Sequence, residues 1–544
     1  MIDRQANWNR VKLTGNGRKN AENTWDVLII GGGATGLGAA VDAASRGYKT
    51  LLVEQADFGK GTSSRSTKLI HGGVRYLAQG NVSLVSESLE ERGILCRRVP
   101  HLVQPLAFLV PSYQWWEKPY YAAGLKAYQY LAGSLSLGAT EIVSRATALE
   151  KVSTLRQQDL SGGVVYYDAQ FDDTRLLVTL ATTADYHDAV LLNYARVDDL
   201  LIESGKVRGA TIVNEETGEE ATARARVVIS ATGAYCDRVR RMADPSASVI
   251  VAPSRGIHLV LPRKFLPGNT ALMVPRTRDG RILFVIPWQD RVVVGTTDTP
   301  IDTIPLEPQA SEAEIDFVLE TAASYLATPP TRADVLSQFA GIRPLVKAGS
   351  GSSTSKLARD HTILTDLSGL VTITGGKWTT YRHMAEDVVT TAAKVGGLAT
   401  KPCLTRDLPL WGATAEHPAC DSPGQYVPSA SPFAHYGADA TAIEKLIEQD
   451  PTLGAPLSPS LPLTPAEVVF HARHEMARTV EDVLSRRSRS LLLDAQASLA
   501  IAPQVATLLA RELAHDSAWI TDQLTQFREL AQHYLPPATS SSSN

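Results

Sequence analysis

The sequence is poor in cysteine, close to neutral in net charge and free of long apolar runs. Four cysteines occur in 544 residues without any C-x-x-C spacing, which predicts free thiols in a reducing compartment. They are Cys96, Cys236, Cys403 and Cys420. No stretch contains roughly eighteen or more consecutive apolar residues, so no segment is expected to span a bilayer. A repeat of solenoid period is also absent.

The charge composition excludes a strong overall field. The 53 Lys and Arg residues nearly balance the 57 Asp and Glu residues, giving a net charge of −4, so we expect no nucleic-acid partner. Residues 1–25 are polar and charged and lack the apolar core of a signal peptide. A hydrophobic content of 44% and a charged content of 20% are typical of an ordinary soluble protein, and the length predicts two or three domains.

Residues 26–54, DVLIIGGGATGLGAAVDAASRGYKTLLVE, have the pattern of a strand, a helix and a second strand. The unbroken apolar run at 27–30 predicts a buried parallel strand, and alanines at helical spacing continue to Gly47. Residues 50–53 predict the second strand, which ends at Glu54. The order of these elements predicts the first βαβ unit of a dinucleotide-binding fold.

Three glycines at the first strand–helix junction have the spacing G-x-G-x-x-G. Gly31 permits a tight turn, Gly33 lets the backbone approach a pyrophosphate, and Gly36 lets the helix pack on the strand. The free N–H groups at the start of that helix favour phosphate, and Glu54 is placed to accept the hydroxyls of the adenosine ribose. The acid argues against NADP but does not separate NAD from FAD. The predicted nucleotide contacts in this unit are Gly31, Gly33, Ala34, Thr35, Gly36 and Glu54.

Residues 59–76, GKGTSSRSTKLIHGGVRY, follow the second strand and combine glycine, small hydroxyl side chains and interspersed basic residues. At this place in a dinucleotide fold, such a segment is typical of a loop around a polar ligand. We therefore favour ligand contact over the alternative, a solvated loop with scattered charge. The predicted cofactor contacts here are Thr62, Ser63, Ser64, Ser66, Thr67, Lys68, His71, Gly72 and Gly73.

Two further predicted strands end at glycine. Residues 206–214 and 220–223 predict a hairpin, and residues 226–231 predict a separate buried strand that runs into Thr-Gly. Residues 370–374 predict a strand that passes through two glycines toward a helix starting at His383, whose free N–H groups are suited to face an anion. The predicted cofactor contacts at these two ends are Ala231, Thr232, Gly233, Gly376, Lys377, Thr379 and Thr380.

Residues 249–299 alternate in the manner of antiparallel strands and predict a sheet that covers the cofactor. His258 lies in the first of these strands, where a lone histidine is more often structural than catalytic. Arg343, Arg359 and Lys377 lie on predicted loops at strand ends. Each has an alternative interpretation as surface charge, but together they are suited to bind a phosphate group.

Residues 113–130, YQWWEKPYYAAGLKAYQY, crowd tryptophan and tyrosine together with two lysines. Aromatic side chains with a polar tip, mixed with lysine, suit a membrane–water interface. A core patch or a dimer patch of aromatic residues is an equal alternative.

The last part of the chain predicts a linker followed by helices. Residues 411–465 are rich in Pro, Ala, Ser and Gly, which is typical of a linker. The sequence T-P-A-E at 464–467 predicts a helix start with a capping box and proline at the first helical position. Helical patterns continue to about residue 535, and the low-complexity tail after it is expected to be disordered.

Two groups in this C-terminal part have open roles. His471 and His474 lie three positions apart without an evident third metal ligand, and we interpret them as structural. Arg486, Arg487 and Arg489 form a basic cluster, for which a solvated helix end and lipid contact are equal alternatives.

Several long motifs follow one another along the chain: DVLIIGGGATGLGAA, GTSSRSTKLIHGGVRYL, GTTDT, GIRPL, ARDH, GGKWTTYR and HEMARTVEDVLSRRSR. Together they resemble the FAD-dependent glycerol-3-phosphate dehydrogenases of the aerobic, membrane-associated, respiratory type. The similarity extends from residue 26 to about residue 535. It implies FAD rather than NAD as cofactor, sn-glycerol 3-phosphate as substrate and dihydroxyacetone phosphate as product.

The resemblance also implies an architecture: an α/β FAD-binding Rossmann-like domain of the glutathione-reductase/D-amino-acid-oxidase type, an antiparallel β-sheet substrate domain and an α-helical C-terminal cap domain. The expected division is an N-terminal segment 1–25, an oxidoreductase region 26–400, a helical domain 401–535 and a disordered tail 536–544. Within the oxidoreductase region we expect FAD-binding parts at about 26–110, 160–248 and 340–400, and substrate-sheet parts at about 111–159 and 249–339.

In such an enzyme the flavin accepts hydride from C2 of the substrate while a base takes the proton of the attached hydroxyl. We expect His258 as this base and Arg65 as the group that polarises the same oxygen. The expected substrate-binding residues are Arg65, Arg343, Arg359, Lys377 and Tyr381. The helix after Gly376, with Thr379 or Thr380, is suited to stabilise negative charge on the reduced flavin. No metal site is expected.

The resemblance further implies a membrane quinone as electron acceptor and a cytoplasmic protein attached peripherally to the inner face of the cytoplasmic membrane. A homodimer is compatible with the aromatic stretch. Three alternatives stay open: oxygen as acceptor, as in related glycerol-phosphate oxidases, whose extra insertion is not seen here; a flavin-binding sensor without turnover; and an amine-oxidising relative. The three cations argue against the last, because a carboxylate needs only one arginine fork.

Overall fold

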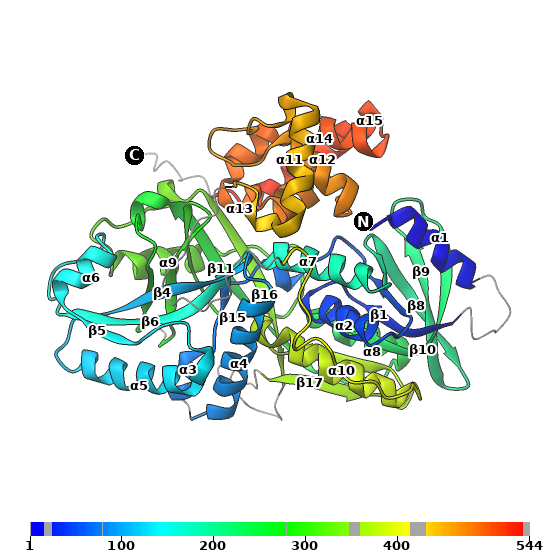
Figure 1. The fold of residues 1–544 in the computed structure, drawn as a ribbon, viewed down its shortest axis with the longest axis horizontal. Helices are drawn as coiled ribbons and strands as arrows, with labels where there is room; N and C mark the ends of the chain where they lie inside the picture. Colours follow the sequence, from blue (N-terminus) through cyan, green and yellow to red (C-terminus); the bar gives the residue numbers. More distant parts are fainter. Residues whose placement is uncertain are drawn as a thin grey trace.

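The structure is a computed structural model that describes residues 2–15, 24–78, 80–278, 280–347, 360–413 and 431–536. Two β-sheets lie side by side with helices against them, and the C-terminal helices lie above the middle of the molecule (Figure 1). This is the predicted architecture of a nucleotide-binding α/β part, a second sheet and a helical C-terminal part. Arg359, Cys420 and the tail from residue 537 lie outside the described residues.

The first sheet has the strand order β17–β18–β10–β1–β2–β7, and all neighbours except β17 and β18 run parallel. Helix α2 (Ala34–Ser45) joins β1 to β2, which confirms the predicted strand–helix–strand unit. The strands are β1 (Trp25–Ile30), β2 (Thr50–Val53), β7 (Val190–Leu192), β10 (Glu220–Ser230), β17 (His361–Thr365) and β18 (Val371–Gly375).

Side chains of β1 alternate between two hydrophobic clusters, as the pleat of a strand requires. Val27 and Ile29 pack with the helices α2, α7 and α10, whereas Leu28 and Ile30 pack on the opposite face against α1 and the hairpin β8–β9. Both faces of the sheet are covered, which explains why this run is apolar at every position. The elements named here are α1 (Arg4–Gly15), α7 (Asp173–Tyr186), α10 (Tyr381–Val395), β8 (Ala195–Glu203) and β9 (Lys206–Asn214).

Helix α1 shows that the segment before β1 is a packed element. Trp8 is fully buried and donates from its ring N–H to Glu219 at 2.8 Å. Arg4 is also buried and pairs with Glu216 at 2.8 Å.

Strand β10 corrects one sequence prediction. The predicted hairpin strand at 220–223 and the predicted buried strand at 226–231 are a single strand. Its first half pairs with β9 through Arg224, and from Ala225 onward it pairs with β1. The polar composition of its first half reflects only that the strand passes from a surface hairpin into the central sheet.

The second sheet has the strand order β15–β11–β14–β13–β12–β4–β6–β3, with β16 added beside β11 and β5 beside β6. Its described pairs are antiparallel except β4 with β12, so the sheet is mixed. The strands are β3 (Leu69–Ile70), β4 (Val103–Ser112), β5 (Glu141–Val143), β6 (Gly162–Phe171), β11 (Val251–Pro262), β12 (Ala271–Val274), β13 (Leu283–Trp288), β14 (Arg291–Gly295), β15 (Thr299–Pro300) and β16 (Ser337–Val346).

The strands of this sheet differ from the division expected from the sequence. Residues up to 110, from 160 and from 340 were expected with the FAD-binding parts, yet most of β4, all of β6 and much of β16 pair within the second sheet. An apolar strand does not reveal locally which of two covered sheets it joins, because the pattern is the same in both.

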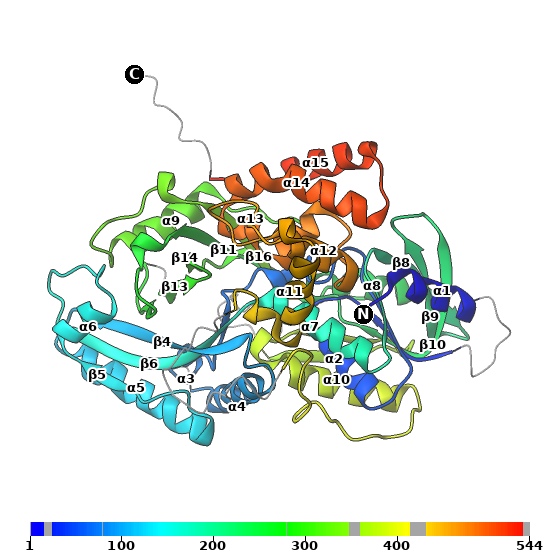
Figure 2. The ribbon, with the colours of Figure 1, turned by 45° about the horizontal axis from the view of Figure 1, so that its top comes forward.

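Helices cover the second sheet on both faces (Figure 2). On one face lie α6 (Arg145–Lys151) and α9 (Glu312–Ala323). On the other lie α3 (Val74–Ala78), α4 (Val82–Arg98) and α5 (Glu117–Ala132). The C-terminal helices are α11 (Ala440–Gln449), α12 (Pro465–His474), α13 (Ser490–Leu493), α14 (Ala495–Leu513) and α15 (Ser517–Gln532).

The C-terminal helices pack on the second sheet through a shared apolar cluster. Val260, Val293 and Phe339 of the sheet join Val468 and Leu492 of the helical part. Helix α12 starts with the predicted capping box, in which the side chains of Thr464, just before the helix, and Glu467 bind each other's backbone N–H. The helical part is therefore attached to the region that holds the candidate site.

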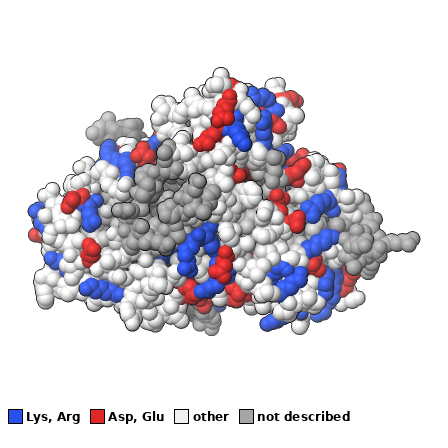
Figure 3. All heavy atoms as spheres, viewed as in Figure 1, with Lys and Arg blue, Asp and Glu red and all other residues white. Residues whose placement is uncertain are grey.

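Among the residues that the structure describes, no helix has both the length and the apolar character needed to cross a bilayer. Positive and negative side chains are interspersed on the face shown in Figure 3. Cys96, Cys236 and Cys403 are free thiols, as predicted.

Candidate cofactor and substrate site

A cavity of about 420 Å³ lies at the carboxyl ends of β1, β2, β10 and β18, beside the amino end of α2. Ligands of parallel α/β sheets bind at this edge. Many predicted cofactor contacts line it: Gly31, Gly33, Ala34, Thr35, Glu54, Thr62, Ser63, Ala231, Thr232, Gly233, Gly376 and Lys377. The structure thus brings the βαβ unit, the following loop and both glycine-bearing strand ends to one cavity.

The glycine turn between β1 and α2 is built by backbone contacts that a side chain would block. Gly31 has φ of +113°, a conformation that favours glycine. A Cβ atom on Gly36 would lie 1.9 Å from the Gly31 carbonyl oxygen, and one on Gly33 would lie 3.1 Å from Ser63 Oγ. The glycine turn at the start of α2 therefore lets the backbone approach the cavity closely, which fits a pyrophosphate held by backbone N–H groups.

Glu54 is fixed at the cavity wall by its own neighbours. Its Oε2 accepts the N–H of Gly32 at 2.7 Å, and its Oε1 accepts the N–H of Ala56 at 3.0 Å. Burial raises the pKa of Glu54, while these two hydrogen bonds act in the opposite direction. A held carboxylate beside a glycine turn fits the ribose and pyrophosphate of an adenine dinucleotide.

Other lining residues were not found from the sequence: Gln55, Ala195, Arg196, Val197, Tyr235, Arg238, Ile304, Leu306, Pro344, Thr374 and Trp378. Trp378 donates from its ring N–H to the Ser63 carbonyl at 2.8 Å. Its position between the predicted contacts Lys377 and Thr379 could have indicated that it lies at the cavity. Residues 195–197 gave no such signal, because only the pairing of strands brings the start of β8 to this edge.

Some predicted cofactor contacts in the loop 59–76 do not line the cavity, and their side chains instead fix the shape of the loop. Ser66 Oγ donates to Asp173 at 2.7 Å, and Lys68 Nζ donates to Asp173 at 2.6 Å and to the Ser64 carbonyl at 2.8 Å. Burial lowers the pKa of the Lys68 ammonium to about 7, against the attraction of the Asp173 carboxylate. These groups anchor the loop on the start of α7.

The end of this loop is held by the segment after β18. Thr379 Oγ1 accepts the N–H of His71 and donates to the His71 carbonyl, both at 3.2 Å. Thr380 Oγ1 lies 3.4 Å from the Lys377 carbonyl, and Gly73 has φ of +80°. The two threonines therefore bind backbone groups in this structure.

A buried hydroxyl holds the same segment from the opposite side. Tyr128 of α5 accepts the N–H of Gly72 at 2.7 Å and donates to Asp168 at 2.8 Å. Arg92 of α4 pairs with Asp168 at 2.6 Å, and all three side chains are buried. Helix α5 is thereby connected through one hydroxyl to the loop after β3. This contact could not be predicted from the aromatic stretch alone.

His258 is buried and close to other groups of the expected site. Its Nε2 lies 2.9 Å from Thr67 Oγ1, and its ring stacks on Phe339 with centroids 4.8 Å apart. Burial, followed by the charges of Lys68 and Arg343, lowers the pKa of His258 well below its usual value. Its Nδ1 has no hydrogen-bond partner among the described residues. This is a neutral imidazole with one nitrogen able to accept a proton.

The expected phosphate cations have different protein partners. Arg343 Nη1 lies 3.3 Å from Asp298, and its side chain is 26% exposed. Lys377 lines the cavity, and its Nζ lies 4.5 Å from the ring centroid of Tyr76. Arg359 lies outside the described residues.

Two expected substrate contacts lie away from the cavity wall. Arg65 is buried, and its Nη2 pairs with Glu307 at 2.7 Å. Tyr381 is buried against α2, where a Cβ on Gly38 would lie 2.8 Å from its ring. The first turn of α10 directs Tyr381 into the core, so the structure gives this residue a packing role.

The aromatic stretch divides between two environments. Trp115, Tyr120 and Tyr130 are 84%, 60% and 87% exposed, whereas Tyr128 is 2% exposed. The stretch therefore contains both a buried tyrosine and exposed aromatic side chains.

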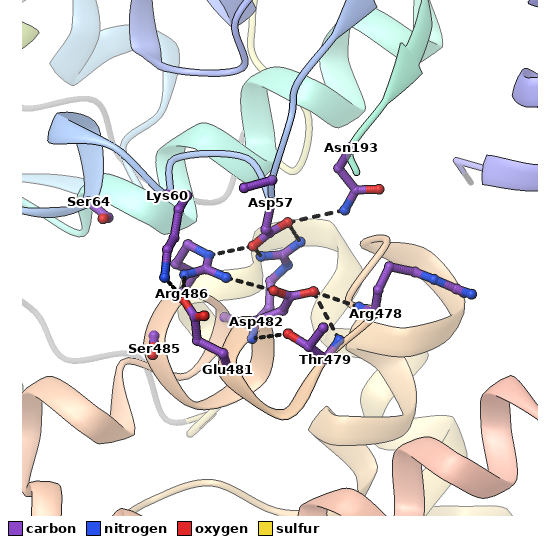
Figure 4. Close-up of polar contacts among 12 residues, drawn as sticks. Asp57, Lys60, Ser64, Asn193, Arg478, Thr479, Glu481, Asp482, Ser485 and Arg486 are labelled. Atoms are coloured by element: carbon purple, nitrogen blue, oxygen red, sulfur yellow. Dashed lines mark hydrogen bonds and ion pairs between the residues drawn. The ribbon is translucent and has the colours of Figure 1, made fainter. Parts of the chain in front are cut away.

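Both interpretations of the basic cluster in the C-terminal part are wrong. Arg486, Arg487 and Arg489 are buried, and Arg486 binds Asp57 of the nucleotide-binding part (Figure 4). Arg489 pairs with Asp173 at 3.1 Å. Such a cluster looks solvated in the sequence because Asp57 and Asp173, which it also binds, lie hundreds of positions away.

No group of His, Cys, Asp and Glu among the described residues is arranged to hold a metal ion. His471 is fully buried and lies 2.8 Å from the hydroxyl of Tyr436, while His474 stacks on Phe470. Both histidines have the structural surroundings that the sequence analysis inferred.

The chain matches two family models. The model described as FAD dependent oxidoreductase matches residues 26–382, and the model described as C-terminal domain of alpha-glycerophosphate oxidase matches residues 403–519. With the glycine turn, the held carboxylate and the cavity at the strand ends, this match defines an FAD-dependent oxidoreductase, and its cofactor is FAD.

Relatives and solved structures narrow the class. The chain is 41% identical to the probable mitochondrial glycerol-3-phosphate dehydrogenase of Caenorhabditis elegans, covering 93% of this chain and 73% of that protein. It is 40% identical to the mitochondrial glycerol-3-phosphate dehydrogenase of Homo sapiens, covering 94% and 74%. It is also similar to the glycerol-3-phosphate dehydrogenase from Bacillus halodurans complexed with FAD, with a TM-score of 0.76, 27% identity and 99% of both chains covered. The chain belongs to the family of FAD-dependent glycerol-3-phosphate dehydrogenases, which confirms the resemblance found in the sequence.

A more distant structure has a similar fold. The L-alpha-glycerophosphate oxidase from Mycoplasma pneumoniae has a TM-score of 0.53 and 19% identity, with 71% of this chain and 98% of that chain covered. At this identity the likeness shows the fold alone.

Proposed function

We propose that this protein oxidises sn-glycerol 3-phosphate to dihydroxyacetone phosphate and passes the electrons through FAD to a membrane quinone. The observation that carries the proposal is its identity of about 40% along nearly the whole chain to proteins named glycerol-3-phosphate dehydrogenase. The cavity at the strand ends, lined by the predicted cofactor contacts, supports the same conclusion.

Substrate phosphate is bound, in this proposal, by Arg343, Lys377 and Arg359. Arg343 keeps part of its side chain accessible, and Lys377 lines the cavity, which supports their role. Charge-assisted hydrogen bonds contribute about 1.5–3 kcal/mol each, so two or three such cations account for most of the binding of a small phosphorylated polyol.

His258 is the proposed base. When its Nε2–H donates to Thr67, its Nδ1 carries the lone pair that accepts the proton of the C2 hydroxyl. The lowered pKa keeps the ring neutral, so the lone pair on Nδ1 is not already protonated. FAD supplies the redox chemistry by accepting the hydride from C2. Arg65 stays a predicted polarising group, and contact with substrate requires it to leave Glu307.

The exposed Trp115, just before α5, and the exposed Tyr120 and Tyr130 of α5 support peripheral attachment to the inner face of the cytoplasmic membrane. Trp115→Ser combined with Tyr130→Ser is expected to reduce sedimentation with anionic lipid vesicles. Leu367→Ser is the matched control, because Leu367 is 97% exposed on a different element. Unchanged sedimentation of the double variant would contradict attachment through α5.

The decisive experiment is an anaerobic titration of the purified flavoprotein with glycerol 3-phosphate. Bleaching of the flavin absorbance, followed by its return on addition of a quinone analogue, is the expected result. Rapid return with oxygen, accompanied by peroxide, would replace the quinone with oxygen as acceptor. Absence of bleaching would remove the enzyme assignment and favour a flavin-binding sensor.

A further inference from the structure

Buried arginines of the C-terminal helical part bind the loop that forms one wall of the cofactor cavity. We infer that Arg486, Arg487 and Arg489 are positioning residues for FAD, because they hold residues 54–64, here called the nucleotide loop, in the shape that retains the cofactor. The inference depends on the FAD of this family and is independent of the proposed substrate.

Asp57 is the first point of attachment. It is fully buried in the nucleotide loop, and its carboxylate accepts from Arg486 Nε at 2.5 Å (Figure 4). Arg487 donates to the same carboxylate from Nη1 at 2.7 Å and from Nη2 at 2.9 Å, and Asn193 donates at 3.2 Å. Burial raises the pKa of Asp57, but the charges of Arg487 and Arg486 outweigh it and hold the carboxylate ionised.

Lys60 is the second point of attachment. Its Nζ pairs with Glu481 at 2.6 Å and with Glu307 at 2.9 Å. Glu481 also pairs with Arg486, which reaches Asp482 at 2.6 Å through Nη2. The two attachment points therefore belong to one connected network of charges, as Figure 4 shows.

The third attachment point is the carbonyl of Ser64. Arg489 Nη2 donates to it at 2.7 Å, and the same guanidinium pairs with Asp173 at 3.1 Å. Arg489 Nη1 donates to the Ser485 carbonyl at 2.8 Å, which fixes the guanidinium to its own helix. The loop is therefore held at its beginning, middle and end.

The backbone of the C-terminal part is irregular where these arginines lie. Asp482–Arg487 forms a π-helical turn, and Arg489 follows with φ of +61°. In a regular α-helix, successive side chains diverge by about 100°. Single π-helical turns occur frequently at functional sites, and in this one the adjacent Arg486 and Arg487 both bind the carboxylate of Asp57.

The nucleotide loop transmits these contacts directly to the cofactor cavity. Glu54 and Gly59 of the loop line the cavity. The N–H of Gly59 donates to the Gly32 carbonyl at 3.0 Å, and the Phe58 ring lies 2.6 Å from where a Gly32 Cβ would stand. A shift at Asp57 therefore moves both the carboxylate expected to bind ribose and the backbone beside the glycine turn.

The same interface contains contacts that do not touch this loop. Arg175 of α7 pairs with Glu475 at 2.7 Å and is buried. Arg478 pairs with Glu216 at 2.7 Å, is partly exposed, and points away from the loop (Figure 4). Buried ion pairs contribute little to net stability. A specific role of the arginines that bind the loop is therefore tested by comparing them with these arginines, which do not contact it.

The test measures release of FAD from the holoenzyme by the rise of flavin fluorescence after dilution. Arg487→Lys keeps the charge but loses the two-pronged contact with Asp57, and Lys60→Met removes the second attachment point. Each variant is expected to release FAD about tenfold faster or more, because each loses at least one charge-assisted hydrogen bond. Arg175→Met and Arg478→Met are the controls matched in burial, with release expected within about twofold of the wild type.

Thermal unfolding of each apoprotein is measured in parallel, so that release is compared between variants of similar stability. Faster release in Arg487→Lys or Lys60→Met with wild-type release in both controls supports the inference. Equal release from all five proteins overturns it, and so does equally accelerated release in the controls, which would make the contacts a general interface. If Arg487→Lys fails to fold, Lys60→Met decides between the same outcomes.

A second measurement does not use variants. Ligand linkage is reciprocal, so a loop that retains FAD is itself held more firmly when FAD is bound. Hydrogen exchange at the backbone amides of Asp482–Arg487 is expected to be slower in the holoenzyme than in the apoprotein. Identical exchange in the two forms would contradict the inference.

Discussion

The hydroxyl of Tyr128 allows a sharp test of how the loop after β3 is positioned. In Tyr128→Phe the ring keeps its place, while the N–H of Gly72 and the carboxylate of Asp168 each lose a partner. Both groups are buried, so water does not replace the hydroxyl without rearrangement of the site.

The size of the effect follows from the two bonds. A buried N–H left without a partner costs about 1–3 kcal/mol, and a hydrogen bond to an ionised carboxylate contributes about 1.5–3 kcal/mol. The sum is about 2.5–6 kcal/mol for a segment that also carries His71. If the segment has to be in place for turnover, the lower end corresponds to a loss of about 60-fold in kcat/KM.

Steady-state kinetics measure the expected loss of kcat/KM in Tyr128→Phe, and urea unfolding measures the expected loss of stability. Tyr166→Phe is the matched control, because Tyr166 is equally buried, lies 6.2 Å from Tyr128 between ring centroids, and donates only to the sulfur of Met273 at 3.3 Å. A bond to a thioether is weak, so the control is expected to change stability by less than about 1 kcal/mol.

Two results would refute the reasoning. The first is a Tyr128→Phe protein with the kcat/KM and the urea midpoint of the wild type. The second is equal behaviour of Tyr128→Phe and Tyr166→Phe, because the loss would then come from removing a buried hydroxyl anywhere in this cluster.

Three further predictions concern the cavity, the substrate and pH. Gly36→Ala is expected to yield protein without flavin absorbance, because its methyl group would overlap backbone at 1.9 Å, whereas Gly124→Ala, with open space around it, keeps the flavin. Arg343→Ala is expected to raise KM about 10- to 100-fold with unchanged flavin content, and a wild-type KM would remove it from the phosphate site. The pKa values of His258 and His471 are lowered by burial and nearby cations, so the unfolded chain binds protons first as pH falls below the usual value of 6.5. The free energy of unfolding should therefore be highest above that pH and decrease below it, and equal urea midpoints at about pH 5.5 and 7.5 would contradict this.

The nucleotide-binding unit was predictable because its requirements lie within consecutive residues. Gly36 has to be glycine on account of Gly31, five positions away, and Glu54 binds backbone two positions along. The arginines at Asp57 show the opposite case, since Arg486 lies 429 positions further along the chain. No local pattern distinguishes such an arginine from a solvated one.

The aromatic stretch is an intermediate case. Tyr128 and Tyr130 are both tyrosines in one dense segment, yet one is 2% and the other 87% exposed. Two positions on an α-helix are separated by about 200°, so helical periodicity alone would have assigned them to opposite faces. Sheet membership of β4 and β6 had no comparable signal, because it depends on pairing between distant strands.

The separation of 429 positions between Asp57 and Arg486 also orders events during synthesis. At about 5–20 residues per second, the ribosome needs roughly 20–85 s to pass from one to the other. During that interval the carboxylate of the nascent chain is hydrated and the wall that it supports is unfinished. If the arginines hold the nucleotide loop as inferred above, firm flavin loading requires the nearly completed polypeptide and is a late step of maturation.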